Sequence, residues 1–237
     1  MPTVLHPATT RIHASLGWLD AYRSFGQGPG VDPARQAFGA LLILNDDTVA
    51  AGRGFGAHPH QNMEIITIPL VGALQHQDSL GHEAVIRANE VQVMSAGTGI
   101  AHSERNNSPQ EPVHFLQIWL LPDQLQLPPR YDQKAFAPES WHNRLAQVAS
   151  PSPDDAGVWL HQQAWLHRGT FEADFTTTYQ VKKSGNGVYV FVLRGEATVN
   201  GQALRPYDGL GSWDISELTI QANSPAEVLL LDVPMLP

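Results

Sequence analysis

The lack of helical periodicity limits the fold of this chain more than any other feature of its sequence. Before Pro122, no stretch of about 12 residues or more places its apolar residues at helical spacing. The apolar runs are short, rich in Val, Ile and Leu, and separated by Gly, Pro, Asn and Asp. The 237 residues include 20 glycines and 18 prolines, so turns are frequent. This pattern predicts an all-β protein, a sandwich or a small barrel, with room for one large or two small domains.

The predicted strands fall into two similar halves. We expect the apolar run at residues 39–44 to end at Asn45-Asp46-Asp47, and Pro69 to mark a strand edge or exit. Asn200-Gly201 is the strongest hairpin signal. The proline-rich segment 122–138 is predicted to be a connector, and residues 26–30 a loop. The expected strands are 39–44, 63–70, 73–78, 84–87, 91–94, 113–121, 160–165, 169–175, 187–193, 197–200, 209–213, 218–222 and 227–233.

The second half repeats the style of the first. The string VYVFVLRGEATVNG and the earlier string MEIITIPLVGALQH both consist of an apolar strand, a Gly turn and another strand. We interpret this likeness as an internal duplication of one β unit. The second copy has no His-x-His pair, so a single metal site would lie in the first half.

Two segments of the first half carry histidines at a spacing that suits a metal site. The string GRGFGAHPH contains His58 and His60, and the string SAGTGIAHSE contains His102 and Glu104. One residue separates the members of each pair, so on a strand they share a face, about 6.6 Å apart along it. On adjacent strands, three imidazoles and a carboxylate could converge on one point. That is a good ligand set for a divalent transition metal.

Composition excludes several other kinds of chemistry. The chain has no cysteine, so disulfides, thiolate ligands and a cysteine nucleophile are excluded. The formal net charge is −9 and Lys and Arg are not clustered, which argues against nucleic acid and anionic membranes as partners. No apolar run approaches the roughly 18 residues of a membrane span, and no signal peptide is visible, so we expect a cytoplasmic protein.

The segments around the histidines resemble the pirin family of the cupin superfamily. The spacing from His58 and His60 through Glu64 to Gly72 resembles the first cupin motif. More narrowly, the strings FGAHPHQNMEI, HQDSLG, SAGTGIAHSE and QIWL resemble pirins. The resemblance covers most of residues 38–131 and extends more weakly over the rest.

The resemblance implies a bicupin, an all-β protein of two tandem cupin (jelly-roll-like) β-barrels. Residues 1–131 would form the N-terminal cupin barrel with the metal site, and residues 132–237 the C-terminal barrel without metal ligands. The expected ion is Fe(II), with nickel, manganese, cobalt, copper and zinc as alternatives. Carried over by position, the family's metal ligands fall on His58, His60, His102 and Glu104.

The resemblance also implies quercetin 2,3-dioxygenase activity. The substrate would be a flavonol-like aromatic molecule that loses its hydroxyl proton to Glu104 as general base. Dioxygen would then open the flavonol ring with loss of carbon monoxide. The alternative is a metal-binding regulatory protein that acts through contacts with a protein partner, without catalytic turnover. An isomerase-type cupin is a third interpretation, which the HSE string disfavours.

Some residue roles have two interpretations. Ordinary cupins take their carboxylate ligand from the first motif, which is Glu64 here, whereas the pirin pattern favours Glu104. Glu64 would then orient a ligand imidazole. His76 and Asp78 are interpreted as a turn-stabilising pair, with the pocket mouth as the alternative. Ser103, between the two expected ligands, should point to the opposite face.

Overall fold

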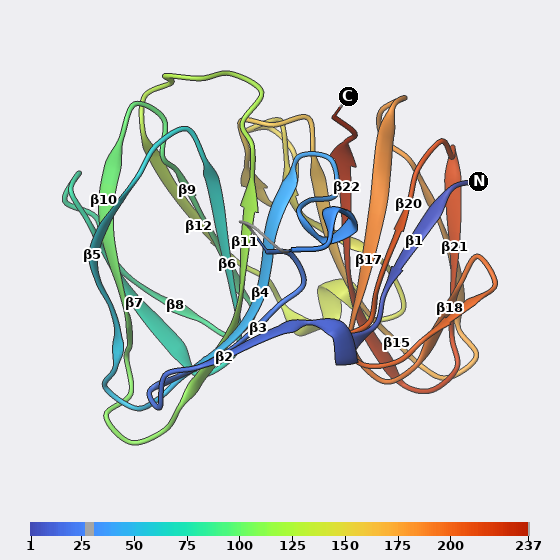
Figure 1. Cartoon of the computed structure of the whole chain (residues 1–237), viewed down its shortest axis with the longest axis horizontal. Helices are drawn as coiled ribbons and strands as arrows, with labels where there is room; N and C mark the ends of the chain where they lie inside the picture. The colour runs from blue at the N-terminus through green and yellow to red at the C-terminus, as the bar shows by residue number, and fades with distance from the viewer. Residues whose placement is uncertain (27–30, 237) are drawn as a thin grey trace.

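The computed structural model describes residues 1–26 and 31–236 and is an all-β protein (Figure 1). The described strands form two seven-stranded and two four-stranded sheets. Except for Gly26, the loop predicted at residues 26–30 lies outside the described residues. No helix in the described part of the chain is long and apolar enough to cross a membrane. The 3₁₀ helices are η1 (Ala8–Thr10), η2 (Pro33–Arg35) and η3 (Pro138–Trp141).

The first half combines a seven-stranded antiparallel sheet with a four-stranded one. The large sheet has the strand order β12-β9-β6-β11-β4-β3-β2, and the small sheet the order β5-β10-β7-β8. The large sheet consists of β2 (Ile12–Ser15), β3 (Leu19–Arg23), β4 (Leu41–Val49), β6 (Glu64–Val71), β9 (Glu90–Ser95), β11 (Val113–Leu120) and β12 (Arg130–Ala135). The small sheet consists of β5 (Gly54–His60), β7 (Ala73–Asp78), β8 (Glu83–Arg87) and β10 (Ile100–Asn106).

The second half has the same plan. Its large sheet has the order β1-β20-β17-β22-β15-β13-β14, and its small sheet the order β16-β21-β18-β19. The large sheet consists of β1 (Thr3–His6), β13 (Ala146–Ser150), β14 (Val158–Trp159), β15 (Trp165–Phe171), β17 (Asn186–Arg194), β20 (Gly209–Ser212) and β22 (Ala226–Pro234). The small sheet consists of β16 (Thr176–Gln180), β18 (Ala197–Val199), β19 (Gln202–Leu204) and β21 (Glu217–Ala222).

The two strand orders confirm the internal duplication. The order β5-β10-β7-β8 corresponds to β16-β21-β18-β19, and the central strands β9-β6-β11-β4 correspond to β20-β17-β22-β15. The hairpin predicted at Asn200-Gly201 is also present between β18 and β19, with φ angles of +46° and +84°. Two residues with positive φ match the right-handed twist of the strands they join.

The units are pairs of sheets rather than closed barrels. Within the described residues, hydrogen bonding leaves each unit as two separate sheets. The all-β plan of two similar units is therefore present, while a continuous barrel is not formed by the described residues. In the first half, Glu104 of the small sheet contacts Thr67 and Gln117 of the large sheet, so these two sheets face each other.

The two halves meet through their large sheets, which lie side by side at the centre of the molecule (Figure 1). One apolar core cluster draws on both sheets. Burial of such a continuous apolar surface is the main stabilising contribution at this junction. Its members include Ile66, Leu116, Ile118, Phe191, Leu229 and Leu231.

The hydrogen bonding crosses the predicted boundary between residues 131 and 132. β12 spans that boundary and pairs with β9 of the first half. β1, at the start of the chain, pairs with β20 of the second half, as Figure 1 shows. The division into 1–131 and 132–237 therefore stays a prediction.

Some strand boundaries differ from those expected. Asn45, Asp46 and Asp47 do not end the strand, because β4 continues to Val49. The strand can continue through these polar residues because Asp46 has hydrogen-bond partners: it accepts hydrogen bonds from Arg11 and His114. The segment 122–138, expected to be a connector, contains β12. Pro69 lies beyond the part of β6 that pairs with β9, which agrees with a strand exit.

Candidate metal centre

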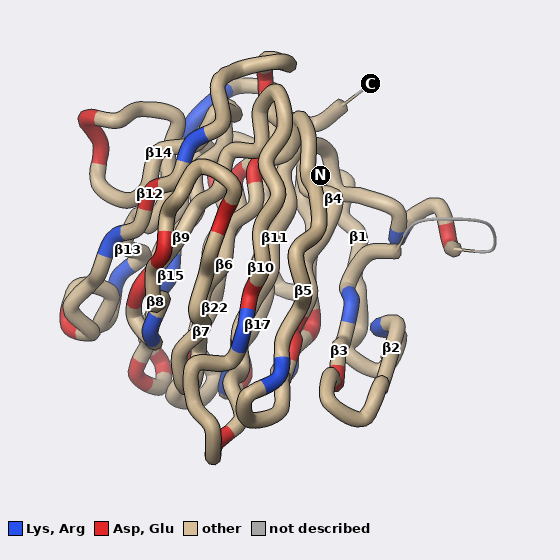
Figure 2. Tube along the Cα trace, turned by 90° about the vertical axis from the view of Figure 1, so that its left-hand side faces the viewer, with Lys and Arg blue, Asp and Glu red and all other residues tan. Residues whose placement is uncertain are grey.

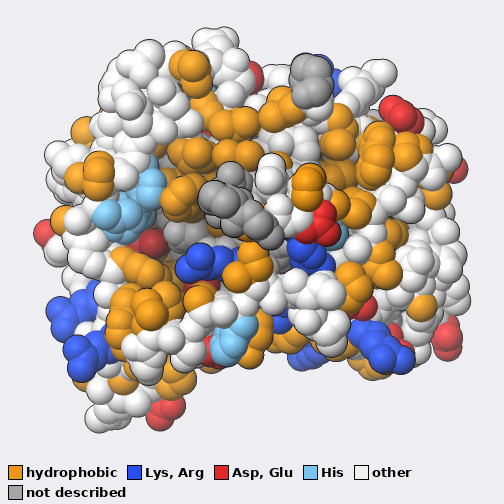
Figure 3. Space-filling view, viewed as in Figure 1, with side chains coloured by type: hydrophobic (Ala, Val, Ile, Leu, Met, Phe, Trp, Pro, Cys, Tyr) orange, Lys and Arg blue, Asp and Glu red, His pale blue; other side chains and the backbone are white. Residues whose placement is uncertain are grey.

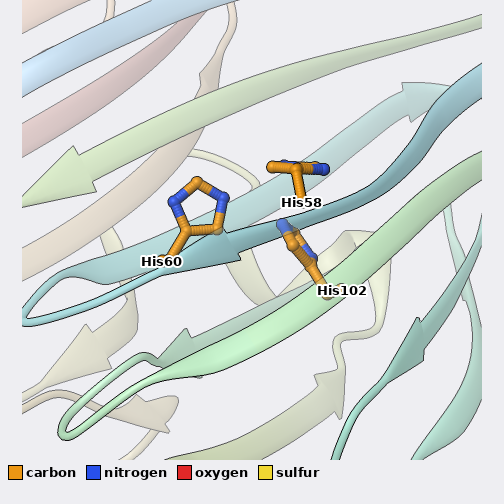
Figure 4. A group of neighbouring side chains, drawn as sticks. All are labelled: His58, His60 and His102. Carbon is orange, nitrogen blue, oxygen red and sulfur yellow. The ribbon is translucent and has the colours of Figure 1, made fainter.

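Strands β5 and β10 are neighbours in the small sheet, as the sequence interpretation required. They pair antiparallel, with His58 opposite His102 and His60 opposite Ile100. Figure 2, which looks onto this side of the molecule, shows the two strands next to each other. Figure 4 shows the three imidazoles on one side of these strands. The pairing therefore brings two histidines of one segment against a histidine that is more than forty residues away in sequence.

The three imidazoles form a compact group. One ring nitrogen from each of His58, His60 and His102 lies within 4.8 Å of the others. The ring centroids are 4.5 Å apart for His58 and His102, 4.8 Å for His58 and His60, and 4.9 Å for His60 and His102. Metal–nitrogen bonds are about 2.0–2.1 Å long, so nitrogens on one ion lie within about 4.2 Å of one another, and these donors need only a small shift to share a single cation.

The chemical state of these imidazoles suits a metal ligand. Nε2 of His60 and Nε2 of His102 are buried and have no hydrogen-bond partner. Burial, with the neighbouring His58, lowers the pKa of His60 to about 4 and that of His102 to about 3. Both rings are therefore neutral at pH 7 and keep a free lone pair. His58 Nδ1 donates a 2.8 Å hydrogen bond to the Gly56 carbonyl, which leaves its Nε2 free as well.

Glu104 lies beside this group but is not part of it. Among the described residues, the cluster of candidate ligand atoms contains the three imidazoles only. The Glu104 side chain is 2% exposed, and its Oε1 accepts hydrogen bonds from Thr67 Oγ1 at 3.3 Å and Gln117 Nε2 at 3.2 Å. Burial raises the pKa of Glu104 to about 7. Glu104 as a fourth ligand therefore stays a prediction.

The partners of Glu104 belong to a polar row that crosses the large sheet in register. Thr67 and Gln117 are paired neighbours in β6 and β11, and the row continues on both sides of them. Some of its atoms have no partner, among them Asn45 Oδ1 and Gln92 Oε1. Unpaired polar atoms inside a protein are costly, so such a row is a place where bound water or a ligand would be stabilised. The row consists of Arg23, Asn45, Gln117, Thr67, Gln92 and Gln133.

A local irregularity separates the two ligand candidates of β10. The register with β5 shifts between His102 and Glu104, so Glu104 lies opposite Phe55. Gly54 permits this close pairing, because a Cβ there would lie 2.2 Å from the Glu104 carbonyl oxygen and 2.5 Å from the Cα of Arg105. The glycine is thus required by the approach of the two backbones.

Glu64 does not have the role proposed for it as a ligand or as a partner of a ligand imidazole. Its Oε2 accepts hydrogen bonds from Ser95 Oγ at 2.8 Å and from the backbone N–H of His161 at 3.1 Å. Its neighbour Ile65 belongs to the core cluster that Trp119 packs against beside the histidines. Successive residues of a strand point to opposite faces, so Glu64 faces the second half instead.

The predicted orientation of Ser103 is confirmed. Ser103 lies opposite Gln77 in β7, and both line a surface groove of about 560 Å³ outside the small sheet, together with Gln75 and Arg105. Another depression of about 480 Å³ borders His60. In the space-filling view, histidine side chains reach the surface over the first half of the molecule, next to hydrophobic atoms (Figure 3).

Sequence reasoning missed the polar residues that hold Glu104. Thr67 stands out as the polar residue in the run Ile65-Ile66-Thr67-Ile68, and that position was a usable signal. Gln117 is separated from His114 by three positions of the same strand, so the two side chains point to opposite faces, and it is Gln117 that faces the inner side. His76 and Asp78 do form the pair that was expected, but His76 also contacts His102.

The fold and the histidine group define a two-unit, all-β protein of the cupin class. The pirin family profile matches residues 6–120, and the profile of the quercetinase C-terminal cupin domain matches residues 147–233. The chain is 40% identical over 230 residues to a quercetin 2,3-dioxygenase of Escherichia coli strain K12. The aligned residues cover 97% of this chain and 98% of that protein.

The chain belongs to the pirin family. The crystal structure of YhhW from Escherichia coli has a TM-score of 0.94 and 40% identity and covers 99% of both chains. A structure of the bacterial pirin YhhW in complex with nickel(II) has a TM-score of 0.92 and 40% identity, over 99% of this chain and 100% of that one.

Proposed function

We propose that this protein is a metal-dependent dioxygenase of the quercetinase type, which opens the ring of a flavonol with O₂. The observation that carries the proposal is the group of three mutually close imidazoles, two of them with buried and unpaired Nε2 atoms. The similarity to a quercetin 2,3-dioxygenase over nearly the whole chain supports the choice of substrate class.

The donor set fits a divalent transition metal. His58, His60 and His102 would hold it, and Glu104 is the proposed fourth ligand. The nickel(II) complex of YhhW supports a divalent ion, and nitrogen and oxygen donors suit iron(II) as well. When bound, such an ion supplies Lewis acidity toward the flavonol oxygens and the one-electron chemistry that reaction with O₂ needs.

Glu104 is the residue of this chain that would move a proton. A carboxylate held beside the three imidazoles suits a general base for the flavonol hydroxyl. The hydrogen bonds from Thr67 and Gln117 to Oε1 fix the carboxyl group against the polar row. The row offers further polar atoms without partners, which would suit a substrate that carries several hydroxyl groups.

The test is oxygen consumption by metal-loaded protein with quercetin. We expect one O₂ consumed per flavonol and no turnover without oxygen. His58→Ala should lower the rate by more than about tenfold. Removing a residue that only hydrogen-bonds a metal ligand already lowers metal affinity or activity by about 10–100-fold. Ser103→Ala, which changes the outer face of β10 between His102 and Glu104, is the matched control and should keep the wild-type rate.

Two results would reject the proposal. One is flavonol turnover that continues without oxygen, and the other is a His58→Ala rate equal to that of the wild type. Metal-loaded protein that consumes no oxygen would favour the regulatory alternative, in which the same histidines hold a metal without turnover.

A further inference from the structure

His76 contacts His102 at Nδ1, the ring nitrogen other than the buried and unpaired Nε2. The His76 side chain is fully buried, and its Nδ1 lies 3.5 Å from His102 Nδ1. Its other nitrogen, Nε2, lies 3.1 Å from Asp78 Oδ2. A continuous chain of polar contacts therefore runs from Asp78 through His76 to His102, and nothing in the assignment of the three histidines accounts for it.

The turn between β7 and β8 holds the Asp78 carboxylate in place. Asp78 Oδ1 accepts hydrogen bonds from the backbone N–H of Leu80 at 2.9 Å and of His82 at 3.1 Å. Asp78 Oδ2 is 3.0 Å from His82 Nδ1. Burial raises the pKa of Asp78, but the hydrogen bonds from His76, His82 and Leu80 outweigh it and lower that pKa below its ordinary value. Asp78 is thus a carboxylate that only accepts hydrogen bonds.

Tyr131 holds both imidazoles of this segment from the neighbouring sheet. Its ring centroid is 4.9 Å from that of His76 and 5.2 Å from that of His82, with which it is stacked at 20°. The Tyr131 ring thus packs against the His76 imidazole while each His76 nitrogen lies beside a different polar partner.

The direction of each hydrogen bond follows from Asp78. Because the carboxylate only accepts, His76 Nε2 carries the proton. The two Nδ1 atoms need one donor and one acceptor between them. In its neutral form His76 has a single N–H group, which faces Asp78, so His76 Nδ1 accepts and His102 Nδ1 carries the N–H. His102 Nε2 is then unprotonated, and this is the buried atom without a partner.

We propose that Asp78 and His76 are positioning residues, which fix His102 in the tautomer whose Nε2 binds the metal. The inference rests on the proposed function in one respect, that the three histidines hold a metal. It adds that the turn at residues 79–82 determines the state of a metal ligand through two intervening side chains. Carboxylate partners commonly orient metal-bound imidazoles, and here a second imidazole lies between them.

Asp78→Asn tests the proposal because it keeps the shape and reverses one hydrogen bond. The amide oxygen would accept from the two backbone N–H groups, so the amide N–H₂ would face His76 Nε2. His76 would then carry its proton on Nδ1 and present a donor to His102 Nδ1. His102 would have to protonate Nε2 or lose the contact, and either change opposes metal binding.

Two measurements test this. Nitrogen-15 NMR of the metal-free protein should show His102 protonated on Nδ1 in the wild type and shifted toward Nε2 in Asp78→Asn. Competition with a chelator should show nickel(II) bound about 10–100-fold more weakly by Asp78→Asn. His76→Phe keeps a ring against Tyr131 but removes the acceptor, and it should also weaken nickel binding. Gln77→Ala, which changes the outer face of the same strand, should bind like the wild type.

The outcomes separate the two proposals. The inference would be overturned if folded Asp78→Asn had the same nickel(II) affinity and the same His102 tautomer as the wild type. This holds whether or not the variant is active. A change in melting temperature alone, with both readouts unaltered, would show a role confined to the turn and would overturn it too. Protein that binds nickel with the expected differences but opens no flavonol would contradict the proposed function and leave the inference standing. If Asp78→Asn does not fold, His76→Phe decides by the same two readouts.

Discussion

At the scale of single residues, the first half is unusual in its buried carboxyl groups. Burial raises the pKa values of Asp47, Glu64 and Glu104 to about 7 each. Asp47 and Glu104 influence each other, since the charge of Asp47 raises the pKa of Glu104 further. A buried acid whose charge is not fully compensated costs stability, and proteins retain such groups mainly at functional sites.

The raised pKa of Glu104 predicts how the stability of metal-free protein depends on pH. The folded state keeps the Glu104 proton up to about pH 7, whereas the unfolded chain loses it near the ordinary value of 4.5. The free energy of unfolding therefore falls as pH rises between these values, by at most on the order of 3 kcal/mol. Glu104→Gln has no such proton to lose. Relative to the wild type, its free energy of unfolding should therefore increase as pH rises over the same range.

Urea denaturation at pH 5 and pH 7.5 in the presence of a chelator measures this effect. Glu64→Gln is the control, because that carboxyl group also has a pKa of about 7 but faces away from the histidines. Like Glu104→Gln, the Glu64→Gln variant should be stabilised relative to the wild type as pH rises from 5 to 7.5. Glu64→Gln should bind nickel(II) as the wild type does, whereas Glu104→Gln should bind nickel(II) more weakly. Parallel curves for Glu104→Gln and the wild type would contradict the prediction.

At the scale of elements, strand β5 supplies two of the three imidazoles and depends on its glycines. Gly54 allows the backbone of β5 to approach Glu104 and Arg105 of β10, at the point where the register shifts. Gly56, two residues further along, has no heavy atom within 4 Å of the place where a Cβ would be. Packing therefore requires a glycine at position 54 of this strand but not at position 56.

Gly54→Ala should disturb the pairing of β5 and β10 and Gly56→Ala should not. The new methyl group at position 54 would overlap backbone atoms, which cannot move without displacing the strand. We expect a loss of about 2 kcal/mol or more in the free energy of unfolding, together with weaker nickel(II) binding. Gly56→Ala should change the free energy by about 0.5 kcal/mol or less. Thermal melts with and without nickel(II) measure both, and equal effects of the two changes would refute the assignment.

At the scale of the whole molecule, the start of the chain ties the halves together. β1 pairs with β20 of the second half, while β2 and β3 continue the large sheet of the first half. His6, at the end of β1, is 3% exposed and lies 3.0 Å from the Tyr189 hydroxyl and 2.9 Å from the Ala34 carbonyl oxygen. Burial, with the charge of Arg35, lowers the pKa of His6 to about 4, so the ring is neutral at pH 7.

His6→Ala should destabilise the whole protein by about 2–4 kcal/mol at pH 7, because it leaves a cavity and removes the hydrogen bonds to the Tyr189 hydroxyl and the Ala34 carbonyl oxygen. The deficit should shrink as pH falls from 6.5 to 4. In that range the unfolded wild type binds a proton at His6 that the folded state refuses. His13→Ala is the control, since its contact with Asp20 is half exposed and should contribute under about 1 kcal/mol. Denaturation curves at pH 7 and pH 5 measure both, and a deficit that grows at pH 5 would refute the role assigned to His6.

The sequence by itself determined the class of fold and the histidines. Strands appear in a sequence as local alternation and turn residues, and a His-x-His pair fixes two side chains on one face without reference to anything distant. The duplication was readable for the same reason, because each copy repeats a local pattern. The boundaries near Asn45, Asp46 and Asp47 were not, since the partners that let polar residues continue a strand, Arg11 and His114, lie far away in sequence.

Only the tertiary structure decided which residues surround the histidines. Strand pairing between β10 and β7 places His76 and Asp78 opposite Glu104 and His102, and sheet facing places Thr67 and Gln117 against Glu104. The tertiary structure also decided that Glu64 faces the other half of the molecule. Alternation along a strand shows which residues share a face, but only the packing of the sheet decides what each face contacts. Contacts of this kind depend on register and layer packing, which are properties of the whole chain and not of any segment of it.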